Sequence, residues 1–191
     1  PQVHLPISGG ERQTGRLKSI CQSLEAKGKP VALAVGLNEA MVRHVDMPRM
    51  PIENMRLVLK NNSKNYLQQD LPNYVFDCFV IPANTLATPA DAAKIANTAV
   101  MKQKVLVAGA KRQAIEDYSA AIKAAGMVAD CVIPGLLGPI NTFELVQPEA
   151  YARSISALVD VGFRHSSISV IAEGELVLSR AVALGGDRLT A

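Results

Sequence analysis

The sequence predicts a mixed α/β fold, and three observations support this prediction. Short runs rich in Val, Ile and Leu recur along the chain, and runs of about four to eight such residues are typical of buried strands. Between some of these runs, apolar residues repeat at helical spacing, as in residues 115–125. The 191 residues are 49% hydrophobic and 19% charged, which is typical of a globular protein with a substantial core.

The first elements follow from local start and stop signals. A helix is expected over residues 11–27, because an apolar stripe crosses its middle and Gly28 ends it. Residues 31–35 and 41–45 are short apolar runs separated by turn residues, so we expect two strands that pair as a hairpin.

The next helix is expected over residues 52–69. Pro51 suits the start of a helix, and Pro72 ends this one. A strand is expected at 74–81. The segment 82–103 is rich in Ala and Thr, and its Thr-Pro pair at 88–89 predicts a helix start.

The second half of the chain alternates strands and helices. Residues 104–108 predict a strand, and the helical stripe that follows closes at Gly126. The remaining expected elements are a strand at 127–133, a helix at 134–145, a linker at 148–153, and strands at 155–161, 168–172 and 176–183.

Composition excludes several classes of function. A net charge of +3 is too small to indicate nucleic-acid binding, and a chain with no Trp, four Phe and four Tyr offers few side chains to stack on bases. The three cysteines and three histidines are isolated from one another, so we expect neither a disulfide framework nor a transition-metal site. No apolar run approaches the roughly 18 residues of a membrane span.

The last three predicted strands carry a candidate phosphate-binding site. Its residues are Asp160, Gly162, Ser166, Ser167, Gly185 and Gly186. Glycine lets the backbone approach a ligand closely, a hydroxyl donates to phosphate oxygens, and a carboxylate binds Mg²⁺, usually through water. The alternative is an ordinary three-stranded meander in which Asp160 and Gly162 only form a turn. Short glycine patterns recur by chance, so spacing alone favours the meander.

Longer segments add a resemblance to a known family. The order strand, Asp-x-Gly, hairpin, two strands and Gly-Gly resembles the second phosphate segment of actin-like ATPases. The segments VDMPRMPIENMRLVLKNNSKNYL, KVLVAGAKRQAIEDYSAAIKAAG, LVDVG and RAVALGGDRLT resemble the PilM family of type IV pilus assembly proteins, relatives of the division protein FtsA. The resemblance implies an actin-like (ribonuclease H-like) fragment with an inserted small α/β subdomain.

The resemblance also implies a division of the chain. Residues 1–30 would be a remnant of the first large domain, and 31–126 the inserted subdomain, called 1C in this family. Residues 127–150 would return to the first domain, and 151–191 would begin the second large domain with its phosphate hairpin.

The resemblance implies Mg-ATP as the ligand of the complete protein, with Asp160 as the Mg²⁺ ligand through water. The first phosphate loop and the adenosine-binding part have no counterpart in this sequence, so we expect no nucleotide bound to this fragment alone. Arg164 and His165 depart from the small or acidic residues usual in the hairpin.

As a PilM-like protein, the chain would be a cytoplasmic adaptor peripheral to the inner membrane, which it would reach only indirectly. It would bind the cytoplasmic tail of a PilN-like protein, along with other pilus assembly proteins, and a homo-oligomer is the alternative to a monomer. The candidate groove for the tail is an apolar face beside basic residues. Its residues are Met41, Arg43, Val45, Ile52, Met55, Arg56 and Leu59. For any single apolar member, ordinary core packing is the alternative.

Other functions stay open at this point. An ATPase would use the hairpin residues, but catalysis needs a complete cleft, so at most weak turnover is expected. An FtsA-like membrane tether would need a C-terminal amphipathic helix. A GspL-like component of type II secretion would share the actin-like layout. A hydrolase based on Ser166 and His165 is disfavoured, because no G-x-S-x-G elbow accompanies them.

Overall fold

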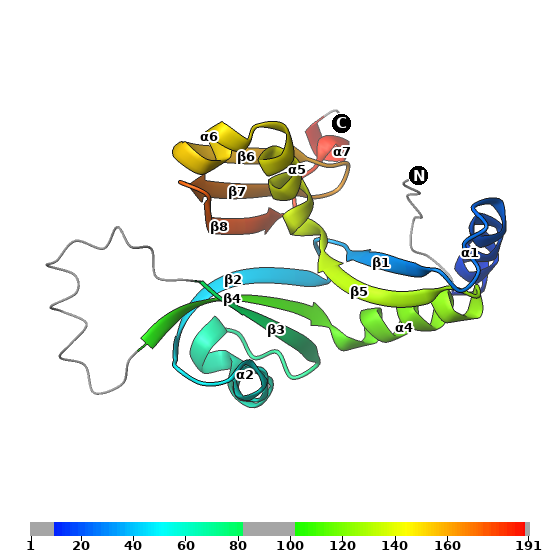
Figure 1. The fold of residues 1–191 in the computed structure, drawn as a ribbon, viewed down its shortest axis with the longest axis horizontal. Helices are drawn as coiled ribbons and strands as arrows, with labels where there is room; N and C mark the ends of the chain where they lie inside the picture. The colour runs from blue at the N-terminus through cyan, green and yellow to red at the C-terminus, as the bar shows by residue number, and fades with distance from the viewer. Residues whose placement is uncertain (1–9, 82–101, 190–191) are drawn as a thin grey trace, which may run out of the picture.

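The computed structural model describes residues 10–81 and 102–189, and within them three separate sheets form (Figure 1). In chain order the elements are α1 (Gly10–Ser23), β1 (Pro30–Val35), β2 (Ala40–Pro48), α2 (Ile52–Leu67), β3 (Tyr74–Val80), β4 (Lys102–Lys111), α4 (Arg112–Ala124), β5 (Val128–Pro134), the 3-10 turn η1 (Gly135–Leu137), α5 (Gly138–Val146), α6 (Pro148–Arg153), β6 (Ile155–Val161), β7 (Ser166–Ala172), β8 (Glu175–Val182) and α7 (Gly186–Leu189).

The first sheet joins β1 to β5, two strands far apart in the sequence. They pair in parallel, ending with Val35 opposite Pro134. The helices α1 and α4 lie together at one end of this sheet (Figure 1). Cys21 of α1 and Ile122 of α4 are buried in the small core that they share. The predicted apolar stripes of these two helices therefore face each other.

The second sheet has the order β2-β4-β3 and is antiparallel. One of its faces is covered by α2 (Figure 1). Met55, Leu59, Ser63 and Leu67 are the buried residues of this helix. Their spacing of four residues places them on one side of the helix, so a single stripe closes the core against the sheet. The best-buried members of this core are Met47, Met55, Leu59, Val105 and Val107.

The third sheet is an antiparallel meander of order β6-β7-β8. Glu173 and Gly174 form the tight turn between β7 and β8, and both have positive φ, as a two-residue hairpin of type I′ requires. The predicted hairpin at this dipeptide is confirmed. In Figure 1 the sheet lies above β2, with α5 and α6 beside β6.

One predicted pairing is wrong. Residues 31–35 and 41–45 do not form a hairpin, because β1 pairs with β5 whereas β2 pairs with β4. The turn between them explains the separation. The N–H groups of Glu39 and Ala40 both donate to the carbonyl of Gly36, and this turn directs β2 into the second sheet.

Two predicted boundaries also differ. The expected linker at 148–153 is the helix α6, with Pro148 in its first turn followed by the acidic Glu149. Both residues favour a helix start, so the signal was present in the sequence. The first helix ends at Ser23, earlier than the predicted residue 27.

The remaining predictions on the fold concern the inserted unit. The strands of the second sheet, from Ala40 in β2 to Lys111 in β4, lie within the predicted span 31–126, and the division of the chain into domains stays a prediction. The predicted helix start at 88–89 lies outside the described residues. Within residues 10–81 and 102–189, no helix combines the length and the apolarity needed to cross a membrane.

Candidate functional site

The predicted phosphate hairpin lies between β6 and β7. Asp160 is exposed near the end of β6 and pairs with Ser167 across the two strands. The turn that follows contains Gly162, Arg164 and His165. The side chain of Arg164 is exposed. The carboxylate and the turn therefore remain accessible at the same end of the sheet.

The two glycine segments of the candidate site contact each other through their backbones. The N–H of Gly186 donates to the carbonyl of Gly162 at 2.9 Å, and the N–H of Asp187 donates to that of Phe163 at 3.0 Å. A Cβ atom on Gly185 would overlap the carbonyl of Phe163 and lie 2.6 Å from the carbonyl carbon of Arg164. Glycine at position 185 is thus required by the fold itself, whatever ligand is bound.

The predicted hydroxyl donors face inward. Ser166 Oγ donates to the carbonyl of Leu184 at 2.6 Å, and Ser167 is only 2% exposed. The hydrogen bond of Ser166 holds the start of β7 against the segment that follows β8. The part of the site that a nucleotide can reach consists of Asp160 and the turn after it.

A carboxylate that the sequence analysis did not single out belongs to the same site. Asp187 follows the Gly-Gly pair, and its Oδ1 is buried without a hydrogen-bond partner in the described structure. A buried carboxylate oxygen is costly unless a donor or a cation satisfies it. Asp160, which is exposed, is accessible to a hydrated Mg²⁺ ion of the kind the resemblance implied, whereas the inward-facing Ser166 and Ser167 do not fit as direct phosphate donors. The described residues hold no cluster of three or more His, Cys, Asp or Glu side chains placed to bind a metal ion.

Three of the predicted groove residues lie in the hydrophobic core. Met55 and Leu59 are completely buried, and Val45 is 9% exposed. All three belong to the core between α2 and the second sheet. The apolar face that the sequence indicated is real, but it packs against the chain's own sheet.

The other predicted groove residues are accessible to different degrees. Met41 is half-buried against the same core, and Ile52 is 37% exposed at the start of α2. Arg43 is half-buried in β2, where burial and the nearby Arg180 lower its pKa. Arg56 points from α2 to β3.

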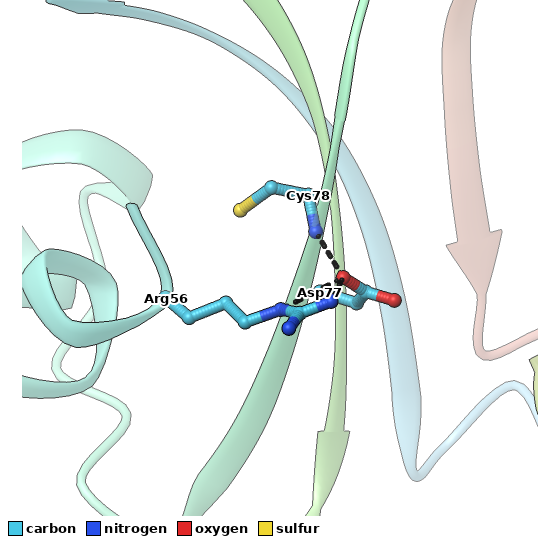
Figure 2. Close-up of polar contacts among 3 residues, drawn as sticks. All are labelled: Arg56, Asp77 and Cys78. Atoms are coloured by element: carbon cyan, nitrogen blue, oxygen red, sulfur yellow. Dashed lines mark hydrogen bonds and ion pairs between the residues drawn. The ribbon is translucent and has the colours of Figure 1, made fainter. Parts of the chain in front are cut away.

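Arg56 forms an ion pair with Asp77 at the free edge of β3 (Figure 2). Arg56 donates to Asp77 Oδ1 from Nε at 3.0 Å and from Nη2 at 2.7 Å. The N–H of Cys78 donates to the same oxygen at 2.8 Å. The hydrogen bond to Asp77 is the main cause of the raised pKa of Arg56. This contact fixes α2 to the edge strand. The guanidinium of Arg56, which was predicted to contact the partner peptide, is thus engaged within the chain.

The neighbouring thiol gives a first prediction. Burial, followed by the charge of Asp77, raises the pKa of Cys78 to about 11. Because only the thiolate reacts, and Cys21 is buried as well, an aromatic disulfide reagent at pH 7.4 should modify only the exposed Cys131 rapidly. Cys131→Ser should remove the rapid phase, and all three thiols should react in urea. If Cys78→Ser instead removed the rapid phase, Cys78 would be the reactive thiol, and its burial and raised pKa would be contradicted.

A cleft of about 280 Å³ separates the second and third sheets. It is lined by His44, Val45, Asp46, Ile81, Lys104, Glu175, Leu176 and Val177. One wall comes from β2 and β4, and the other comes from β8. Both β2 and β8 are outermost strands of their sheets, so each presents an unpaired edge near the cleft.

Of the predicted groove residues, only Val45 lines this cleft. The sequence contains no local signal that the other residues of the cleft lie together. Glu175, Leu176 and Val177 lie more than a hundred residues after His44, so only the packing of the two sheets brings them together. The His44 ring contacts β8 directly, with Nδ1 at 2.9 Å from the carbonyl oxygen of Val177.

Comparisons with solved structures identify similar folds. A chain of a structure described as the PilM-PilN type IV pilus biogenesis complex superposes with a TM-score of 0.75, at 16% identity over 96% of this chain and 51% of that one. The cytoplasmic domain of EpsL, an inner membrane component of the type II secretion system of Vibrio cholerae, superposes with a TM-score of 0.57, at 14% identity over 93% of this chain and 58% of that one. The chain thus spans about half the length of the chain that it matches in this complex.

Comparison of the sequence with protein families identifies the family of the chain. No curated protein sequence matches it significantly. The family described as type IV pilus assembly protein PilM matches over residues 10–191, which is nearly the whole chain. The predicted actin-like α/β fold class agrees with this family and with the superposed PilM structure. The chain belongs to the PilM family of type IV pilus assembly proteins.

Proposed function

We propose that the chain is part of an actin-like adaptor of type IV pilus assembly that binds the cytoplasmic tail of a PilN-like inner-membrane protein. The observation that carries the proposal is the cleft between β2, β4 and β8. It combines two free strand edges with apolar and charged side chains, which suits an extended peptide. The superposed PilM structure is itself a complex with PilN, which supports the same partner class.

The lining of the cleft specifies how such a peptide is held. Ile81 and Leu176 provide apolar contacts, whereas Lys104 and Glu175 provide charges of opposite sign. An extended chain places successive side chains on opposite sides, so apolar anchors can enter the cleft while its backbone pairs with an exposed strand edge. At about 280 Å³ the cleft holds one or two anchors, and the rest of the peptide lies along its rim.

The proposal has a nucleotide part. In the complete protein, Asp160 would hold Mg²⁺ through water, and the turn from Gly162 to His165 would lie beside the phosphates of ATP. Arg164, an exposed cation in this turn, adds charge complementarity. We place binding above hydrolysis, because catalysis needs a complete and preorganised cleft. The protein would act on the cytoplasmic side of the inner membrane, together with other assembly proteins.

Two leucines of β8 give a matched test of the peptide site. Leu176 lines the cleft, whereas Leu178 lies two residues further along and outside it. Leu176→Ala should weaken binding of a synthetic PilN tail peptide about tenfold, the loss of one buried anchor of roughly 1.4 kcal/mol. Leu178→Ala should leave the affinity unchanged. Isothermal titration calorimetry on the full-length protein measures both.

The opposite pattern would reject this cleft as the site. Equal affinities for the wild type and Leu176→Ala would mean that the peptide binds elsewhere. The predicted groove around Ile52 would then be the next candidate, and Ile52→Ala would be the variant to compare. No binding by any of these proteins would reject the adaptor function itself.

A further inference from the structure

We propose that the cleft continues onto the open face of the second sheet, and that this larger surface binds a basic and apolar segment of the partner tail, with Phe79 as its second apolar anchor. The inference rests on the proposed function, because it concerns the same partner and names the side chains that the partner must carry. We define the docking surface as the lining of the cleft together with Leu106 and Phe79.

The strand β3 is covered on one face and accessible on the other. Successive residues of a strand point to opposite faces, and Phe76 and Cys78 are buried in the core beneath α2. The intervening Val75 and Phe79 therefore lie on the other face, where they are 38% and 62% exposed. Exposed apolar side chains that adjoin a groove are typical of an interaction site.

The strand register joins Phe79 to the cleft. Phe79 pairs with Leu106 of β4, and Leu106 pairs on its other side with His44 of β2, which lines the cleft. Residues directly opposite each other share a face, so these three side chains form one row across the sheet. The adjacent row contains Asp46 and Lys104, which also line the cleft. The floor of the cleft and the open face at β3 are thus one continuous surface.

The length of this surface suits an extended peptide. Neighbouring strands lie about 4.8 Å apart, so the row from β2 to β3 covers roughly 10 Å. An extended chain advances about 3.3 Å per residue and turns every second side chain to the same side. A peptide with one side chain in the cleft would therefore place the residue two or four positions away on Phe79.

Two contacts show how the edges of β2 and β8 face each other across the cleft. Before β2 begins, Nδ2 of Asn38 lies 3.5 Å from Nδ1 of His165, beside the end of β8. Within β2, Nδ1 of His44 lies 2.9 Å from the carbonyl oxygen of Val177, near the start of β8. The two strands therefore run in opposite directions, so the last residues of β2 and the first residues of β8 lie at the same end of the cleft.

That end of the cleft carries charges without partners. Asp46 of β2 and Glu175 of β8 both belong to its lining, with Lys104 opposite Asp46 on β4. Among the residues that the structure describes, the ion pair is that of Arg56 with Asp77, so these three charges form none there. Two carboxylates and one ammonium leave the cleft with an excess of one negative charge, although the whole chain has a net charge of +3. The cleft therefore favours a cationic residue beside its apolar wall.

This chemistry matches the class of partner. Cytoplasmic segments next to a membrane span are enriched in Lys and Arg. A tail of this kind supplies a cation for Asp46 and Glu175, and its apolar residues contact Leu176 in the cleft and Phe79 on the open face. The carboxylates also select against acidic segments, whose charges they would repel.

The first part of the test concerns the second anchor. In calorimetry on the full-length protein, Phe79→Ala should weaken binding of the synthetic PilN tail peptide about tenfold, as loss of an aromatic anchor does. Leu57→Ala, which removes a 56% exposed side chain from α2, should bind as the wild type does. Both side chains are exposed, so urea unfolding should show wild-type stability for both variants. In an alanine scan of the peptide, the residue that contacts Phe79 should matter to the wild type and not to Phe79→Ala.

The second part concerns the charge requirement. Asp46→Asn and Glu175→Gln should each weaken binding about threefold, and this loss should shrink as the salt concentration rises. Asp70→Asn removes an exposed carboxylate outside the docking surface and is the matched control. A peptide whose Lys and Arg residues are replaced by Gln should bind the wild type more weakly, and it should bind Asp46→Asn and the wild type equally.

The outcomes distinguish the two proposals. If the wild type binds no peptide, the proposed adaptor function fails. If Leu176→Ala weakens binding whereas Phe79→Ala does not, the adaptor function stands, the tail stays within the cleft, and the larger docking surface is overturned. If Asp46→Asn and Glu175→Gln bind as tightly as Asp70→Asn, or the neutral peptide binds as tightly as the basic one, the charge requirement is overturned.

Discussion

Gly185→Ala is expected to destabilise the protein by roughly 3 kcal/mol or more, at the upper end of over-packing effects. The added Cβ would overlap the carbonyl of Phe163 and lie 2.5 Å from its carbonyl carbon. Both obstacles are backbone atoms in a turn tied by hydrogen bonds to Gly186 and Asp187, so no flexible side chain can move aside. Relief requires separating the hairpin from the end of β8. Urea unfolding followed by circular dichroism measures the change.

Gly138→Ala is the matched control. Gly138 has helical φ and ψ at the start of α5, and a Cβ there would meet nothing within 4 Å. Alanine should be neutral or stabilise by up to about 1 kcal/mol, because it restricts the unfolded chain. Nucleotide binding should fall with Gly185→Ala and stay unchanged with Gly138→Ala. A stable Gly185→Ala protein would show that the two turns are not held together as described.

Local features of the fold could be predicted from the sequence because their causes are local. The turn at Glu173 and Gly174 follows from one dipeptide, and the helix starts follow from proline and acidic residues within one turn. Strand existence also follows from short apolar runs. The pairing of β1 with β5 could not be predicted in this way, because about ninety residues separate the two strands and neither contains a signal for its partner.

The candidate site shows the same limit. The spacing of Asp160 and Gly162 indicated the hairpin, but not that Gly185 contacts its turn or that Ser166 donates to the carbonyl of Leu184. The cleft depends on the packing of β8 beside β2 and on the contact between His44 and the carbonyl of Val177. Neither has a sequence signature of its own. The partner class was inferred from the family resemblance, whereas the cleft became evident only from the packing of the sheets.

The predicted groove on α2 rests on a stripe of apolar residues, and such a stripe is expected both for a helix that packs on its own sheet and for one that binds a partner. A stripe of apolar residues at spacing four on α2 indicates a face that is covered, but the pattern does not say what covers it. For Met55 and Leu59 the covering surface is the chain's own sheet. The accessible neighbour Arg56 is likewise engaged within the chain, by Asp77.

Leu59→Ala is therefore expected to cost about 2 to 5 kcal/mol, the usual range for a fully buried leucine in a core that relaxes only partly. Leu59 is completely buried between α2 and the second sheet. Leu57, on the same helix, is 56% exposed, so Leu57→Ala should stay within about 0.5 kcal/mol of the wild type. Urea unfolding of the two variants gives the difference directly, with helix propensity nearly matched because both change Leu to Ala.

Peptide titration of the same two variants decides between core and groove. If α2 only supports the fold, the folded Leu59→Ala protein at low temperature should bind the PilN tail peptide with nearly wild-type affinity, because the cleft is lined by β2, β4 and β8 and not by α2. A tenfold loss of peptide affinity with little loss of stability would instead mean that the partner reaches Leu59. That result would require α2 to lift from its sheet on binding, since nothing else exposes a side chain that is completely buried.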